Sequence, residues 1–177
     1  MLKEVIKEKL IPIKSKTLLN EFMDWVDEDT LKFKALMDCF FDKELRVCQR
    51  ASWPVLHIGI QKHHMIKPYL SKMVENLEHA PHQAVVRNTV RIFQDIKIPS
   101  SLSGELYEKC FNYMVDAKSP IAVKCFSMSI LAKLASTYPE LSSELVAVIE
   151  EQLPYSSAGF KSRAKKLLPD LRKAVLK

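Results

Sequence analysis

The sequence repeats itself with a period of about 37 residues. Basic residues stand at this spacing at Arg50, Arg87 and Lys124, and a fourth, Arg163, follows after 39 residues. Apolar residues recur at matching offsets from these positions: Phe33, Leu36, Met37 and Phe40; Leu70, Met73, Val74 and Leu77; Tyr107, Cys110, Phe111 and Met114; and, shifted by about one residue, Leu145, Val148 and Ile149. Self-similarity at one fixed period is typical of stacked copies of a single supersecondary unit. The repeat therefore predicts an array of similar units.

Each unit is predicted to contain two antiparallel helices. Prolines such as Pro81, Pro99 and Pro120 divide the chain into segments that are each one helix long. Apolar residues within these segments recur every three or four positions, as an amphipathic helix requires. We predict helices over residues 2–10, 16–27, 30–42, 44–61, 65–79, 82–96, 102–116, 120–137, 141–153 and 159–175. Pro54 is expected to kink its helix. Asp29 or Thr30, and Ser156 or Ser157, are expected to cap the helices that follow them.

Glycine is too scarce for several other fold classes. The chain has three glycines, far apart in sequence, whereas phosphate-binding loops and dinucleotide-binding folds need several close together. The small number of β-branched alternations argues against a sandwich or a barrel. The predicted fold is all-α, a single α-α superhelix or solenoid that forms one domain over residues 1–177. We predict about four helix pairs, over residues 14–43, 44–80, 81–117 and 118–156, followed by a C-terminal capping helix over 157–177.

The charges around the repeated basic residues resemble a known family. Asp42 precedes Arg50 by eight residues, and Asp116 precedes Lys124 by the same distance. A unit of 37–39 residues with this pattern resembles a HEAT repeat, an armadillo-like helix pair. Two units depart from it, with His79 and Tyr155 where the acidic residue should stand. The resemblance implies an α-solenoid in which Arg50, Arg87 and Lys124 belong to a structural ladder of charges along the stack. It implies little about function.

A second resemblance covers residues 119–168. This stretch is similar to a group of small bacterial helical-repeat proteins, many of which carry an automatic name of adenylosuccinate lyase. The lyase superfamily has a loop of the form Ser-Ser-x-Met-Pro-x-Lys-x-Asn, whose serine is the catalytic base. The corresponding segment here, residues 156–163, lacks the Met-Pro pair and the Asn and is one residue shorter. We therefore predict that the protein is not an enzyme, with a lyase, as the automatic names suggest, as the remote alternative.

The net charge of +6 lies entirely in the last helix. Residues 158–177 contain seven basic residues and one acidic residue, Asp170, whereas the charges of residues 1–157 cancel. The predicted helix should bury one apolar stripe and leave its basic residues in solvent. The candidate surface for an anionic partner is Lys161, Lys165, Lys166, Arg172 and Lys173. The alternative interpretation is a capping helix that needs only a polar outer face.

A second candidate surface is the stripe formed by Arg50, Trp53 and His57, which stand at i, i+3 and i+7 of one predicted helix. An arginine beside a tryptophan can stack on a base or bind an acidic peptide. The alternative, which we favour, is a tryptophan packed between repeats with the guanidinium over its ring.

The sequence predicts no metal site and no cofactor. The five histidines contain no His pair at i, i+4 and no acid–histidine pair with zinc-site spacing. The four cysteines contain no CxxC motif, so we predict reduced and mostly buried thiols and a cytoplasmic protein. The longest stretch without a charged side chain, residues 51–61, is too short to span a bilayer.

These observations favour a non-enzymatic interaction module that binds a protein partner. Solenoids expose long curved surfaces, and the helices expected at 30–42, 65–79, 102–116 and 141–153 would line the concave side. The alternative is a nucleic-acid-binding protein related to the DNA-alkylation-repair glycosylases, which also use HEAT-like repeats. Those enzymes line the concave face with basic and aromatic side chains, whereas the segments 65–79 and 102–116 are nearly balanced in charge.

Overall fold

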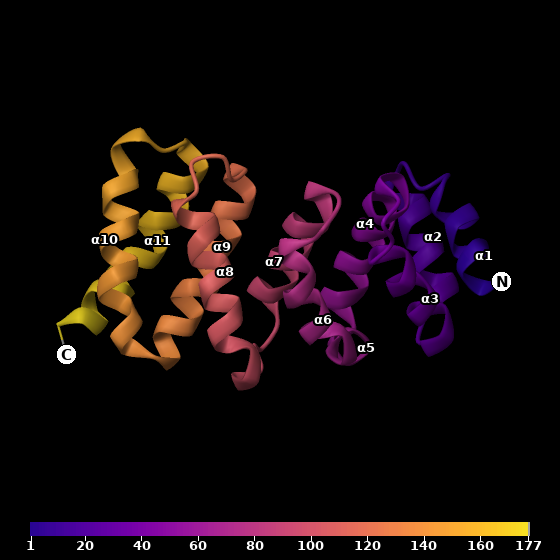
Figure 1. The fold of residues 1–177 in the computed structure, drawn as a ribbon, viewed down its shortest axis with the longest axis horizontal. Helices are drawn as coiled ribbons and strands as arrows, with labels where there is room; N and C mark the ends of the chain where they lie inside the picture. The colour runs from indigo at the N-terminus through magenta and orange to yellow at the C-terminus, as the bar shows by residue number, and fades with distance from the viewer. Residues whose placement is uncertain (177) are drawn as a thin grey trace. The chain divides into compact units, whose positions relative to one another are not determined.

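The computed structural model describes residues 1–176. The chain forms two compact units, one over Met1–Ile92 and one from Phe93 onward. All regular secondary structure in the described residues is helical (Figure 1). Within residues 1–176, no helix is long and apolar enough to cross a lipid bilayer.

In the first unit, α3 packs against both α1 and α4. Asn88 on α7 donates a hydrogen bond of 3.1 Å to the Ser52 hydroxyl on α4, and both side chains are buried. The helices of this unit are α1 (Leu2–Leu10), α2 (Lys16–Val26), α3 (Thr30–Phe40), α4 (Leu45–Gln61), α5 (His63–Ile66), α6 (Leu70–Glu75) and α7 (Gln83–Asp95). The last residues of α7, from Phe93, belong to the second unit.

The second unit is built around α9. Its helices are α8 (Ser103–Val115), α9 (Ile121–Thr137), α10 (Ser142–Gln152) and α11 (Ala158–Val175). Helix α9 packs against α8 and α11, and α10 packs against α11. The buried residues of α9 lie on several sides of the helix, as expected for a helix with neighbours around it.

Most predicted helices are confirmed to within two residues at each end. The exception is the helix predicted over 65–79, which is replaced by short helical segments. A 3₁₀ turn over Lys67–Tyr69 separates α5 from α6, and a second one over Asn76–Glu78 follows α6. Pro68 lies in the first of these turns and has no backbone N–H to donate, so an α-helix is weakened there. By contrast, α4 continues through Pro54.

Most of the periodic apolar positions form the core, whereas Tyr107, Phe111 and Val148 are half-buried. Phe40, Leu77 and Met114, which share one offset in the repeat, are all buried. The predicted buried thiols are confirmed, since all four cysteines are free and buried. Burial raises the pKa of Cys39 to about 11 and that of Cys110 to about 12. Because the thiolate is the reactive form of cysteine, these residues act as small apolar side chains.

Two predicted helix caps are confirmed. The Asp29 carboxylate accepts hydrogen bonds from the backbone N–H groups of Leu31 and Lys32 at the start of α3. The Ser157 hydroxyl accepts one from the N–H of Phe160 at the start of α11, at 3.3 Å. The neighbouring Ser156 hydroxyl donates to the carbonyl of Gln152 at 2.6 Å. Both serines therefore have a role in ending α10 and starting α11.

Candidate functional site

Helix α11 has the amphipathic build that its sequence predicts. Phe160, Ala164, Leu168 and Leu171 are buried, and Leu167 is half-buried. Val175, which continues this apolar stripe, is 45% exposed because it is the last residue of the helix. The buried stripe holds α11 against α9 and α10 and leaves the opposite side of the helix facing solvent.

The five predicted basic residues of α11 are all exposed. At 100° per residue, they form two rows. Lys161, Lys165 and Arg172 lie along one side of the exposed surface, and Lys166 and Lys173 lie along the other. These five residues are called the basic face of α11 below.

Two members of the basic face have acidic neighbours. Arg172 donates two hydrogen bonds, of 2.9 and 2.6 Å, to one carboxylate oxygen of Glu150 on α10. Lys173 lies 3.6 Å from the carboxylate of Asp170. Among residues 1–176, the ion pairs include none for Lys161, Lys165 or Lys166. These three ammonium groups are therefore the cations most available to a partner.

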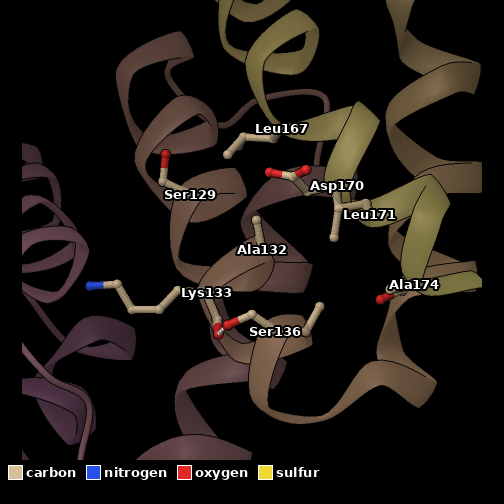
Figure 2. A pocket seen from close by; sticks show the side chains of 10 residues that line it. Ser129, Ala132, Lys133, Ser136, Leu167, Asp170, Leu171 and Ala174 are labelled. Carbon is tan, nitrogen blue, oxygen red and sulfur yellow. Dashed lines mark hydrogen bonds between the residues drawn. The ribbon is translucent and has the colours of Figure 1, made fainter.

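A cavity of about 310 Å³ lies between α9 and α11 (Figure 2). Lys166 and Lys173, the second row of the basic face, immediately precede its wall residues Leu167 and Ala174. Its walls are Ser129, Ala132, Lys133, Ala135 and Ser136 from α9, Ser142 from α10, and Leu167, Asp170, Leu171 and Ala174 from α11. The pattern of apolar residues did not reveal this cavity. Alanines at positions facing another helix look the same in sequence whether the neighbour fills the space or leaves it open.

The ammonium group of Lys133 turns away from the cavity (Figure 2). Its ammonium group donates hydrogen bonds to the backbone carbonyls of Phe93, Gln94 and Ile96, the last at 2.9 Å. These carbonyls lie at or just beyond the end of α7, where helices leave acceptors without partners. Burial lowers the pKa of Lys133. This lysine, which the sequence analysis did not single out, is a C-terminal cap for α7 and is already engaged.

Arg163 on α11 contacts side chains of α7 and α9. Its guanidinium donates to the side-chain oxygen of Gln94 at 2.7 Å and to the hydroxyl of Ser129. Lys124, its counterpart one repeat earlier, donates to the Met114 carbonyl at 3.2 Å. The contact of Lys124 supports the structural role that the resemblance to HEAT repeats implies for it, and the contacts of Arg163 are of the same kind.

The stripe of Arg50, Trp53 and His57 is only partly assembled. The rings of Trp53 and His57 are half-buried and meet edge to face, with their centroids 6.1 Å apart. Burial and the nearby charges of Arg91 and Lys16 lower the pKa of His57. Arg50 is exposed. The cations found over a tryptophan ring lie elsewhere in this unit, at Trp25, where Lys9 and Lys32 approach the ring centroid to 4.5 and 4.7 Å.

The sequence also bears on the side chains that could ligate a metal and on the acidic residues in the repeat pattern. Within residues 1–176, no group of three or more His, Cys, Asp or Glu side chains is placed to hold a metal ion.

The two acidic residues of the repeat pattern have different partners. Asp42 forms an ion pair with Lys3 on α1 at 2.6 Å. Asp116 instead accepts hydrogen bonds from the Lys118 N–H and the Ser119 hydroxyl in the loop that follows α8.

Comparison with known families agrees with the helix pairs. A model of the HEAT repeat domain matches residues 6–171, nearly the whole chain. The chain belongs to the HEAT repeat family. HEAT repeats commonly bind proteins and are usually non-catalytic. Comparison with curated proteins and with solved structures gives no match. The resemblance to proteins named as adenylosuccinate lyases therefore gains no support from a named relative.

Proposed function

We propose that the protein is a non-catalytic HEAT repeat module that binds an acidic region of a partner protein through the basic face of α11. The observation that carries the proposal is the set of exposed lysines at Lys161, Lys165 and Lys166, which have no ion pair among residues 1–176. An unpaired cluster of one sign raises the local concentration of partners of the opposite sign and accelerates their association.

Two features favour an acidic protein over a nucleic acid. Arg172, the one guanidinium on the basic face, is occupied by Glu150, although arginine is the side chain best suited to bind phosphate with two hydrogen bonds. The second row also borders a cavity whose walls include the apolar residues Ala132, Ala135, Leu167, Leu171 and Ala174. Apolar contacts flanked by charges are typical of protein–protein interfaces.

The test compares three forms of the full chain in pull-downs from native lysate. The first is the wild type, the second carries Lys161→Glu, Lys165→Glu and Lys166→Glu, and the third carries the control set Lys14→Glu, Lys67→Glu and Lys97→Glu. The control lysines are also exposed, so both variants change the net charge equally. We expect the wild type and the control to recover the same protein, and the α11 variant to lose it. Direct titration of the purified partner then checks the interaction.

Two outcomes would contradict the proposal. Recovery of the same proteins by all three forms would show that α11 is not the binding surface. Binding of duplex DNA that depends on the α11 lysines, with no protein recovered, would favour the nucleic-acid alternative. About four phosphate contacts would then give a log–log salt slope near −3.6.

A further inference from the structure

We propose that the cavity between α9 and α11 receives one large apolar side chain of the acidic partner, while Lys166 and Lys173 hold carboxylates on either side of it. This inference rests on the proposed function and adds an anchor to it. It assigns to the partner a segment in which an aliphatic residue such as leucine is flanked by glutamates or aspartates.

The apolar part of the argument comes from the side chains that face each other across the cavity. Ala132 on α9 lies opposite Leu167, Leu171 and Ala174 on α11 (Figure 2), and Ala135 also lines the α9 side of the cavity. The alanines are too short to fill the space between the two helices, and the volume of about 310 Å³ is at the lower end of the range for ligand pockets. Leu167 remains half-buried, so a partner side chain placed here would remove further apolar surface from water.

The charged part of the argument comes from the edge of the cavity. Lys166 immediately precedes the wall residue Leu167, and Lys173 immediately precedes the wall residue Ala174. Their spacing of seven residues puts them on one side of α11, two turns apart, with Asp170 between them. Asp170 offsets one of these two charges and lies 3.6 Å from Lys173, but both side chains of this pair are exposed, so Lys173 can exchange Asp170 for a partner carboxylate. Lys133 is engaged at α7. The edge therefore retains an excess positive charge, which favours carboxylates beside the inserted side chain.

Ser142 provides a separate observation at the same cavity. Its side chain is fully buried and lines the cavity. Among residues 1–176, its hydroxyl has no hydrogen-bond partner. Buried hydroxyls nearly always have one, so the unpaired hydroxyl shows that this wall of the cavity is incompletely packed.

The experiment measures fluorescence polarisation of a short labelled peptide with the full chain. The peptide has one central leucine between pairs of glutamates, and two control peptides replace either the leucine by serine or the glutamates by glutamine. We expect the wild type to bind the first peptide and each control peptide to bind at least about tenfold more weakly. A loss of this size is expected when a leucine side chain is no longer buried.

Cavity-filling variants locate the binding. Ala132→Leu and Ala174→Leu each fill the cavity from a different helix, and each is expected to weaken peptide binding at least about tenfold. The matched control, Ala122→Leu, makes the same change at a half-buried position of α9 that does not line the cavity. It should bind as the wild type does. Thermal unfolding identifies any variant that has lost its fold, and the two filling variants provide independent readings.

The outcomes separate this inference from the proposed function. The cavity assignment is wrong if the wild type does not bind the leucine peptide, or binds the serine peptide equally well, or if both folded filling variants still bind. If partner capture nevertheless depends on the lysines of α11, the proposed function stands without the anchor. If capture is independent of those lysines, the proposed function is wrong, whatever the peptide does.

Discussion

The two units carry the same net charge but arrange it differently. Residues 1–92 contain 15 basic and 12 acidic residues, and residues 93–177 contain 12 and 9. In the first unit, several lysines are engaged locally: Lys3 with Asp42, Lys34 with Asp38, Lys62 with Asp27, and Lys9 and Lys32 with the ring of Trp25. In the second unit, the segment before α11 is net acidic, and the positive charge is concentrated on α11.

This difference separates two uses of lysine. A lysine that pairs within its own unit contributes to the stability of that unit, as Lys133 also does when it caps α7. A lysine that remains exposed and unpaired on a helix already packed by its apolar stripe contributes little to folding. Net charge alone would not distinguish the two units, whereas the location of the unpaired charges does.

The largest expected effect tests whether the two units share the same kind of core. Phe40→Ala in the first unit and Met114→Ala in the second each remove a fully buried side chain. Each should lower the free energy of unfolding by about 2–5 kcal/mol, because transfer and cavity terms add. Denaturant titration measures the change, and Lys165→Ala, at an exposed position, should cost less than about 0.5 kcal/mol. A small loss at one of the two buried positions would show that the units differ in packing as well as in charge.

The sequence predicted those core positions because helical periodicity records which side of each helix is buried. It also predicted the Asp29 and Ser157 caps, since these depend on contacts within four residues of the cap. It missed the role of Lys133, whose acceptors lie 37 to 40 residues earlier in the chain. It identified the basic residues of α11 but not the cavity beside them, because a void depends on the spacing between helices rather than on the type of residue.

A smaller effect tests the paired lysines of the first unit. The hydrogen bond from Lys3 lowers the pKa of Asp42 and in turn raises the pKa of Lys3. A carboxyl group with a lowered pKa stabilises the fold at pH values above 3.8, its ordinary pKa. This stabilisation is lost as the pH falls through the lower pKa of the folded state. For Lys3, the raised pKa stabilises the fold below pH 10.5, its ordinary pKa, and this stabilisation is lost as the pH rises through the higher pKa of the folded state.

Asp42→Asn should therefore reduce the loss of stability on acidification, measured by denaturant titration between neutral and acidic pH. In a Lys3→Met background, the same substitution should have a smaller effect, because the main cause of the lowered pKa is gone. Equal effects of Asp42→Asn in both backgrounds would mean that the pair does not contribute to folding. The paired lysines of the first unit would then not differ from the unpaired lysines of α11 in their contribution to stability.

The smallest expected effect concerns Lys161, the fourth residue of α11. The amino end of a helix carries a partial positive charge, so a lysine there is opposed by the helix dipole, and the first turn of α11 contains no acidic residue to compensate. Lys161→Glu should therefore raise the free energy of unfolding by about 0.3 kcal/mol or slightly more. The stability of Lys161→Gln should lie between those of the wild type and Lys161→Glu.

Lys161→Glu should also weaken binding of the acidic partner. A lysine that lowers stability where it stands, yet is needed for binding, would be accounted for by function rather than folding. A Lys161→Glu variant that is less stable and binds as well as the wild type would instead assign Lys161 to the fold, together with the paired lysines of the first unit.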